Sequence, residues 1–282
     1  MNINFSERYP EMKAAFGFEV DQILFSEQSP FQKIEILQTP GFGKVLIIDG
    51  CIMLTERDEF VYHEMIAHPP LFVHPHPEKI LIIGGGDGGT ARECLRHPSV
   101  AQIDLVDIDE LVSQACLAHL PAIAGALLSE KVRCRFEDGV AYVKNCPERY
   151  DLIIIDSTDP ISVGEGLFSR EFYQNCHRLL REDGILVNQS ESPSWLPKIV
   201  KGVHSKLSAI FPRMHFYQAH IPTYPSGHWV FGFASKRYHP VEDFQQDRYR
   251  SSGMKFRYYN QALHAGAFAI PTFFQELIDD AR

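Results

Sequence analysis

The chain has 282 residues, of which 45% are hydrophobic and 22% are charged. This length allows one large α/β domain with a smaller domain attached, and the composition excludes a disordered chain. The formal net charge is −9 and the Lys and Arg residues form no cluster, so we expect no nucleic-acid partner. An acidic protein suits a small cationic substrate instead, because its field concentrates cations near the surface.

No apolar run reaches the roughly 18 to 20 residues that span a bilayer, and residues 1–8 have no basic stretch followed by an apolar core. We therefore expect a cytoplasmic protein with no membrane partner. The six cysteines are scattered without a C-x-x-C pair, which is typical of reduced thiols. The histidines show no metal-binding spacing, and His-Pro-His-Pro at residues 74–77 fits a stiff linker better than a ligand set. We expect no bound metal ion.

Residues 1–75 are predicted to form a small domain of short β-strands. Its clearest element is a hairpin, because residues 44–48 and 51–54 flank Asp49-Gly50, a pair that supplies the positive φ angles of a two-residue turn. A helix is predicted to follow, with its cap and first-turn acids at residues 55–59. It is expected to end at about Ala67, before two consecutive prolines.

Residues 76–282 are predicted to form a Rossmann-like catalytic domain. The predicted strands are residues 80–83, 103–106, 132–136, 152–155 and 185–187. The predicted helices between them are residues 90–96, 110–120, 170–180 and 197–211. Apolar strands linked by helices indicate a mostly parallel sheet covered on both faces. The last two strands, near residues 214–217 and 229–234, have a link too short for a parallel crossover, so an antiparallel last strand is predicted, as in methyltransferase-like sheets.

A glycine-rich loop, Gly84-Gly85-Gly86-Asp87-Gly88-Gly89, follows a predicted strand and precedes a predicted helix, so it fits G-x-G-x-x-G in a meaningful context. Missing side chains let the backbone approach a ligand closely. Asp107 ends the next strand, where it can accept hydrogen bonds from both ribose hydroxyls. Asp138, before Gly139, ends the third strand, where an adenine amino group could meet it. These positions predict a nucleoside site.

The nucleoside features alone do not separate a nicotinamide dinucleotide from ligands of the S-adenosylmethionine type. Asp87 favours the second class, because a carboxylate within the glycine loop would oppose a pyrophosphate and attract an amine. The positive end of the following helix weakens this argument without removing it.

A second group of acids follows the fourth predicted strand. Asp156-Ser157-Thr158-Asp159-Pro160 leads into a glycine-containing loop, and Glu191 lies near the end of the fifth strand. Tyr62, His63 and Tyr224 could add hydroxyl or imidazole contacts from flanking segments. So many carboxylates require a cationic ligand, because burying unpaired anions is costly. A diamine and a sulfonium–ammonium donor would supply the charges, whereas the alternative, Mg²⁺, lacks an apparent phosphate site to share it.

In these motifs the sequence resembles the polyamine aminopropyltransferases, the family of spermidine synthase, and the resemblance covers essentially the whole chain. The motifs that carry it are residues 54–60 (LTERDEF), 62–65 (YHEM), 84–88 (GGGDG), 156–160 (DSTDP) and 221–227 (IPTYPSG). The resemblance implies a small N-terminal β domain joined to a methyltransferase-like Rossmann domain. It also implies a homodimer or homotetramer.

The resemblance implies roles for individual residues. Asp156 matches a catalytic aspartate that accepts a proton from the attacking amine, and Tyr62 matches its hydrogen-bonding helper. The residues implied to hold the aminopropyl group and the diamine are His63, Asp87, Asp156, Ser157, Thr158, Asp159, Glu191 and Tyr224. The residues implied to contact the thioadenosine part are Gln32, Gly84, Gly86, Asp107, Asp138, Gly139 and Val163.

The implied reaction moves the aminopropyl group of decarboxylated S-adenosylmethionine, a co-substrate, to a diamine with no tightly bound cofactor. Putrescine is the default acceptor, and the products are spermidine and 5′-methylthioadenosine. One alternative is an S-adenosylmethionine methyltransferase, although Asp87 and Asp156 would repel the α-carboxylate of its donor. The other is a non-catalytic polyamine-binding protein. Two positions depart from the family pattern: Asp107 stands where glutamate is common, and Val163 where the lid often carries proline.

Overall fold

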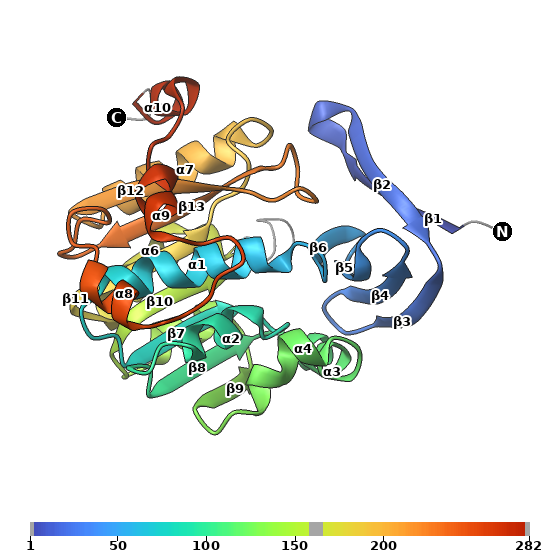
Figure 1. Ribbon diagram of the computed structural model, residues 1–282, viewed down its shortest axis with the longest axis horizontal. Coiled ribbons are helices and arrows are strands. Elements are labelled where there is room, and N and C mark those ends of the chain that lie inside the picture. Colours follow the sequence, from blue (N-terminus) through green and yellow to red (C-terminus); the bar gives the residue numbers. More distant parts are fainter. Residues whose placement is uncertain (1–2, 158–165, 280–282) are drawn as a thin grey trace.

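The computed structural model describes residues 3–157 and 166–279. Figure 1 shows a small β part on one side, which contains the N-terminus, and a larger α/β part on the other. The strands fall into a two-stranded hairpin, a four-stranded sheet and a seven-stranded sheet. This arrangement confirms the predicted fold class, a Rossmann-like sheet preceded by a small β domain.

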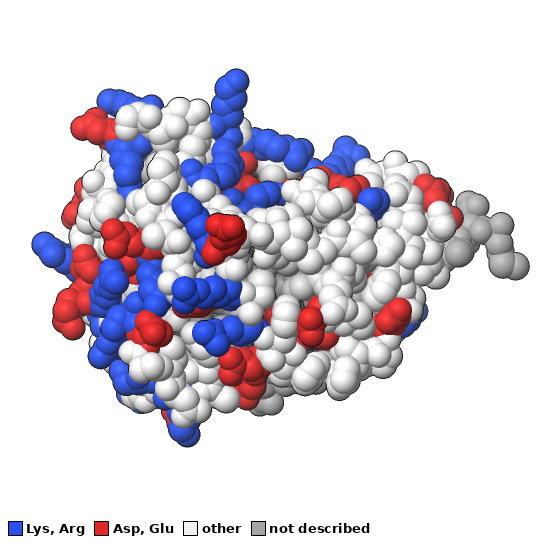
Figure 2. All heavy atoms as spheres, turned by 90° about the horizontal axis from the view of Figure 1, so that it is seen from below, with Lys and Arg blue, Asp and Glu red and all other residues white. Residues whose placement is uncertain are grey.

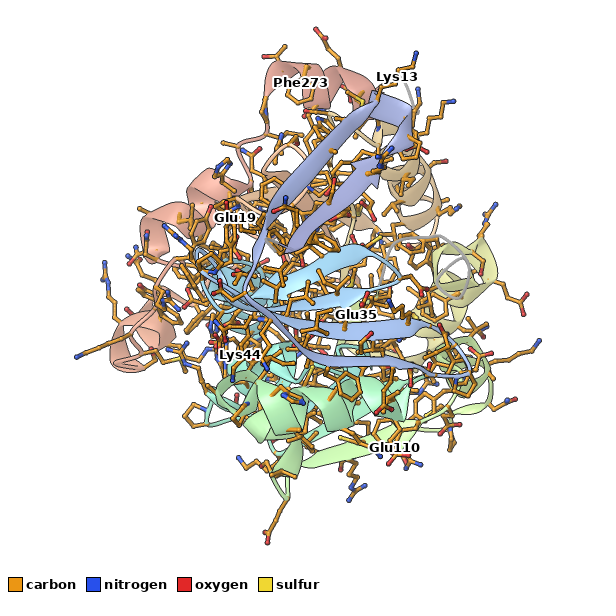
Figure 3. The ribbon with its side chains drawn as sticks, turned by 90° about the vertical axis from the view of Figure 1, so that its right-hand side faces the viewer. Lys13, Glu19, Glu35, Lys44, Glu110 and Phe273 are labelled. Atoms are coloured by element: carbon orange, nitrogen blue, oxygen red, sulfur yellow. The ribbon has the colours of Figure 1, made fainter. Side chains whose placement is uncertain are left out.

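The N-terminal part consists of an antiparallel hairpin followed by an antiparallel sheet of order β3-β4-β5-β6. Its elements are β1 (Ile3–Tyr9), η1 (Pro10–Met12), β2 (Ala14–Val20), β3 (Gln22–Gln28), β4 (Lys33–Thr39), β5 (Gly43–Ile48) and β6 (Cys51–Thr55). The predicted two-residue turn is confirmed, with φ values of 49° at Asp49 and 80° at Gly50. Figure 3 looks onto this sheet, with Lys13 at the far end of the β1–β2 hairpin.

The large sheet has the order β12-β13-β11-β10-β7-β8-β9. Its strands are β7 (Lys79–Gly84), β8 (Gln102–Asp107), β9 (Val132–Phe136), β10 (Tyr150–Asp156), β11 (Leu180–Gln189), β12 (Arg213–His220) and β13 (His228–Ser235). Strands β7 to β11 pair in parallel, and only β13 runs against its neighbours. The prediction of an antiparallel last strand is confirmed.

Helices cover both faces of the large sheet, because successive side chains of its buried strands point to opposite sides. Ile80 and Ile82 join one buried cluster with residues of α1 to α4, whereas Leu81 and Ile83 join another with residues of α5 to α7 and α10. The helices are α1 (Glu59–Val73), α2 (Gly89–Leu95), α3 (Glu110–His119), α4 (Pro121–Ala124), η2 (Gly125–Leu128), α5 (Gly139–Asn145), α6 (Arg170–Leu179), α7 (Pro197–Ser208), α8 (Gln246–Ser251), α9 (Gln261–Ala267) and α10 (Thr272–Asp279).

The expected end of the first helix near Ala67 is wrong, since α1 continues through Pro69 and Pro70 to Val73. A proline at position 69 leaves the carbonyl of Met65 without its usual helical donor. The hydroxyl of Tyr217 donates to that carbonyl at 2.8 Å. A distant side chain therefore replaces the helical hydrogen bond that Pro69 removes.

Helix α1 packs on the large sheet, where it contacts β10, β11 and β12. The proposed domain boundary at residue 75 stays a prediction. Hydrogen bonds join the two parts of the chain on either side of α1: the Lys44 ammonium donates to the carbonyl of His119, and the Tyr224 hydroxyl donates to that of Met53. The small sheet is thus fixed against the Rossmann part.

On the face in Figure 2, acidic side chains are interspersed among the basic ones. Within the described ranges, no single helix is long and apolar enough to cross a membrane; one pair, α3 with residues 121–128, meets that requirement jointly but is bent by 114°.

The C-terminal segment is tied to α1 by Glu64, whose side chain is 2% exposed. Its carboxylate accepts hydrogen bonds from three successive backbone amides, those of Arg257, Tyr258 and Tyr259, at 2.8 to 2.9 Å. Hydrogen bonds to a buried anion are stronger than neutral ones. Glu64 therefore fixes the path of the chain between α8 and α9.

We predict that Glu64→Gln lowers the free energy of unfolding by about 2 to 3 kcal/mol, because the amide cannot accept all three bonds and places its own NH₂ against a donor. Urea unfolding at pH 7 measures the change. Glu276→Gln on the exposed side of α10 is the matched control and should shift stability by less than about 0.5 kcal/mol. Equal effects of the two substitutions would contradict the prediction.

Candidate active site

A cleft at the carboxyl ends of the parallel strands encloses about 930 Å³, its open mouth included. Open α/β sheets bind ligands at this edge. The predicted site residues on its wall are Gln32, Tyr62, His63, Gly84, Gly86, Asp87, Asp107, Asp138, Gly139, Asp156, Ser157 and Tyr224. The structure thus brings together residues from the small sheet, α1, four parallel strands and the β12–β13 connection.

The glycine loop contacts the backbone at the end of β10. Gly84 has a φ of 82°, and a Cβ atom there would lie 2.1 Å from the carbonyl oxygen of Asp156. That oxygen accepts a 2.8 Å hydrogen bond from the amide of Gly85. Only glycine allows both the backbone conformation and this close approach. The loop and the acid after β10 are therefore held in direct contact.

The end of the cleft that is predicted to hold the nucleoside contains Asp107. One carboxylate oxygen accepts from the amide of Gly86 at 3.0 Å and the other from the amide of Asp109 at 2.9 Å. Burial raises the pKa of Asp107 to about 6, although these two hydrogen bonds oppose the shift. Asp138, also on the cleft wall, caps α5 by accepting from the amide of Val140.

Asp156 sits between two hydroxyl donors. The Tyr62 hydroxyl donates to one carboxylate oxygen and the Thr90 hydroxyl to the other, both at 2.6 Å. Burial and the nearby negative charge of Asp87 raise the pKa of Asp156, while His63 and the two hydroxyls act in the opposite direction. The two hydroxyls fix the orientation of the carboxylate, while its burial and the charge of Asp87 increase its affinity for a proton.

Asp87 and His63 form the next pair. The Nε2 atom of His63 lies 3.3 Å from Asp87 Oδ1, and its Nδ1 atom lies 2.5 Å from a Glu59 oxygen. Burial raises the pKa of Asp87, but the charge and hydrogen bond of His63 outweigh it, so the net shift is downward. The two neighbouring aspartates thus shift in opposite directions.

His63, Asp87 and Asp156 also lie close enough together to surround an ion, with their ligand atoms within 4.8 Å of one another. A metal-bound histidine must present a nitrogen lone pair to the ion. Both ring nitrogens of His63 face carboxylate oxygens and must donate to them. This geometry disfavours a metal at these three residues.

A second hollow of about 410 Å³, its opening to solvent included, adjoins the cleft and shares Met53, Tyr62, Ser157 and Tyr224 with it. Its other walls are Glu7, Cys51, Ile52, Gln189, Pro225 and Trp229. Glu7 comes from β1, where its carboxylate accepts from the amide of Ile52 at 3.0 Å. The cleft that Asp156 lines therefore adjoins a hollow with a buried acid of its own.

Sequence reasoning missed several residues of this site. Thr90 had a usable sign, since its hydroxyl immediately follows the glycine loop. Glu7, Gln189 and Trp229 had none, because only the folded chain brings them to the second hollow. Glu191 is buried and accepts weakly from Gln189 at 3.4 Å, but it lines neither hollow. Its predicted role, like the other assigned roles, stays a prediction.

Three predicted site residues lie outside the described residues: Thr158, Asp159 and Val163.

Comparison with known proteins identifies the family. Residues 59–246 match the model of the spermine/spermidine synthase domain, and residues 3–56 match the spermidine synthase tetramerisation domain. The chain belongs to the spermine/spermidine synthase family. The resemblance noted in the sequence is confirmed.

Similarity to individual family members extends over the full chain. This chain is 48% identical to a polyamine aminopropyltransferase of Clostridium botulinum (strain Eklund 17B / Type B), with 100% of each chain covered. It is 51% identical to that of Alkaliphilus metalliredigens (strain QYMF), with 94% of each covered. A crystal structure of spermidine synthase with the transition-state analogue AdoDATO matches at a TM-score of 0.96 and 38% identity, covering 98% of this chain and 95% of that one. The crystal structure of spermidine synthase from Thermotoga maritima matches at a TM-score of 0.94 and 38% identity, covering 98% of this chain and 94% of that one.

We predict that Gly84→Ala destabilises the protein by at least about 3 kcal/mol, because the methyl group adds left-handed strain to a clash with the Asp156 carbonyl. Thermal unfolding measures the loss. Gly202→Ala is the matched control: it lies within α7, where an added Cβ meets nothing within 4 Å, and it should stabilise by about 0.5 to 1 kcal/mol. A Gly84→Ala protein as stable as wild type would show that the loop is not held in this contact.

Proposed function

We propose that this chain is a spermidine synthase, which transfers the aminopropyl group of decarboxylated S-adenosylmethionine to putrescine and releases 5′-methylthioadenosine. The observation that carries the proposal is that Asp87 and Asp156 line the cleft, while Ser157, the residue after Asp156, lines both the cleft and a second hollow that contains Glu7. The complex of a related spermidine synthase with AdoDATO supports it.

The donor fits the larger cleft. Its thioadenosine part would lie along the glycine loop, with the ribose hydroxyls at Asp107 and the adenine near Asp138 and Gly139. Its ammonium and sulfonium groups are cations, and Asp87 is the carboxylate kept ionised beside them by His63. The donor lacks the α-carboxylate of S-adenosylmethionine, which two aspartates would repel.

The acceptor fits the smaller hollow. A diamine entering it places one amine at Asp156, where Ser157 and Tyr62 line both spaces. The far amine has the carboxylate of Glu7 and the amide of Gln189 on the walls around it. The Tyr224 hydroxyl already donates to the Met53 carbonyl at 2.6 Å, so its oxygen is oriented to accept from an ammonium.

The reaction is a direct displacement. An alkyl ammonium ordinarily has a pKa of about 10.4, so it must lose a proton before its nitrogen can attack. Asp156 accepts that proton, and the nitrogen lone pair then forms a bond to the propyl carbon next to sulfur. The carbon–sulfur bond breaks, its electron pair stays on sulfur, and the positive sulfonium becomes a neutral thioether. Since the product nitrogen is a secondary ammonium, one proton is released overall.

Assembly into a homo-oligomer is part of the proposal, supported by the match of residues 3–56 to a tetramerisation domain. Light scattering after size exclusion distinguishes a dimer from a tetramer. The cytoplasmic location and the lack of a tightly bound cofactor, both expected from the sequence, stay predictions.

Incubation with putrescine and decarboxylated S-adenosylmethionine should yield spermidine and 5′-methylthioadenosine, and Asp156→Asn should lower kcat at least about 100-fold with an unchanged unfolding midpoint. Mass spectrometry identifies the products. Intact S-adenosylmethionine is the control donor and should give no transfer. S-adenosylhomocysteine as a product would support a methyltransferase, and binding of both substrates without any product would support a non-catalytic polyamine-binding protein.

The pKa of about 6 at Asp107 predicts a pH dependence of nucleoside binding. As pH falls through 6 the carboxylate gains a proton and loses a charged acceptor, so the Kd for 5′-methylthioadenosine should rise about tenfold between pH 7 and pH 5. Calorimetry measures this Kd with a ligand that carries no sulfonium or ammonium group, so the Kd does not report on Asp87 and Asp156. Asp107→Asn should bind weakly at every pH, and a wild-type Kd that does not change with pH would refute the assignment.

A further inference from the structure

Behind the wall of the donor cleft lies a set of charged side chains that the reaction itself does not use. Glu59 and His63 are one turn apart on α1, and Arg92 comes from α2. Neither Glu59 nor Arg92 lines the cleft or the second hollow. Their hydrogen-bonded connection to the cleft is His63, which does line it, and the charge of Arg92 also contributes directly to lowering the pKa of Asp87.

The hydrogen-bond geometry of His63 determines its charge. Its Nδ1 atom faces a Glu59 oxygen at 2.5 Å, and its Nε2 atom faces Asp87 at 3.3 Å. Carboxylates accept and do not donate, so a neutral ring would turn one bare nitrogen toward an anion. The arrangement is satisfied only when both nitrogens carry protons.

Arg92 donates two parallel hydrogen bonds to the Glu59 carboxylate, one from each terminal nitrogen, at 3.1 and 2.8 Å. Its Nε atom also contacts Glu93 at 2.9 Å. A two-pronged guanidinium–carboxylate contact fixes direction as well as distance. Glu59 is 7% exposed, so little solvent screens it from Arg92 or His63.

The ring of His63 has no room to turn away from this position. Gly89, the first residue of α2, lies against its face, and a Cβ atom there would come within 2.2 to 2.5 Å of three ring atoms. The Tyr62 ring packs against it edge-on, with centroids 5.4 Å apart. The glycine is thus required for space, and the imidazole is enclosed between α1 and α2.

We propose that Glu59 and Arg92 are positioning residues: together they hold His63 as an imidazolium cation against Asp87, and this fixes Asp87 where the ammonium group of the donor binds. The inference rests on the proposed function only for the identity of that donor. It assigns the clamp, defined as Glu59, Arg92 and His63, to donor binding and not to acceptor binding.

The titratable and charged groups that face His63 come from each packed element: Glu59 and Tyr62 on α1, Asp87 in the glycine loop, Arg92 on α2 and Asp156 on β10. Burial alone would lower the pKa of His63, but the charge of Asp87 and the hydrogen bonds to Asp87 and Glu59 raise it to about 10. The cation in turn lowers the pKa of Asp87, while Asp87 raises that of Asp156. These opposite shifts in pKa suit Asp87 to bind a cation as an anion and Asp156 to accept a proton as a base.

The charge is tested by NMR titration of the ring nitrogens of His63 in wild type, Glu59→Gln and Arg92→Lys. Wild-type His63 should stay protonated to about pH 9. Glu59→Gln should lower its midpoint by about 1 to 3 pH units, since it removes a contacting anion, and Arg92→Lys by less. Arg96→Gln, at the C-cap of the same helix, is the matched control: Arg96 contacts Glu93 but not Glu59, so the midpoint should not move.

The positioning role is tested by the Kd for decarboxylated S-adenosylmethionine between pH 6 and 9. In Glu59→Gln the Kd should rise about tenfold above the lowered midpoint, where a neutral ring bonds Asp87 more weakly, while the Kd for putrescine stays constant. Losing a nearby positive charge would by itself tighten the binding of a cationic donor. A higher Kd for the donor therefore shows that Asp87 has lost its position.

Three results would overturn the clamp: an unchanged His63 midpoint in both clamp variants, a tighter donor Kd in Glu59→Gln, or equal losses for donor and acceptor. Arg92→Lys keeps a positive charge and serves as the second test if Glu59→Gln does not fold. The NMR titration needs no turnover. A wild-type protein that binds no donor would refute the proposed function. If the wild type binds the donor and every variant has the same donor Kd at every pH, only the clamp would be refuted.

Discussion

The close contact between the glycine loop and the end of β10 is the constraint on which the site depends. The carbonyl of Asp156 holds the loop through the amide of Gly85, and Asp156 also lines the cleft. One residue thus sets the path of the glycine loop and carries the proposed proton acceptor. Because both belong to Asp156, the distance from the loop to the proposed base is fixed by covalent geometry and two neighbouring strands.

The site is incomplete without the small N-terminal sheet. Gln32 lines the cleft from this part, and Glu7 lines the second hollow from the hairpin before it. The joint is polar: Ser29 donates to Asp109 at 2.6 Å, and Asp58 accepts from both the amide and the hydroxyl of Thr223. Directional bonds of this kind specify one relative placement, which apolar packing alone does less well.

The sequence was sufficient for the parts of the structure that depend on local chemistry. Asp49-Gly50 demanded a tight turn, and the acids at strand ends had to meet at one edge of a parallel sheet. It was insufficient where a remote group changes a local rule. The carbonyl that Pro69 leaves without a helical donor is satisfied by Tyr217, 152 residues away. Glu7 accepts a hydrogen bond from Ile52, 45 residues away, and no local pattern marks that contact.

Three consecutive residues of α1 point in three directions: Tyr62 toward Asp156, His63 toward Asp87, and Glu64 toward the C-terminal segment. Each step along a helix turns the side chain by about 100°. Inserting or deleting one residue before Tyr62 would therefore misdirect all three side chains at once, and no single compensating substitution could restore them. The length of the connection between β6 and α1 should thus vary little among active relatives, whatever side chains it carries.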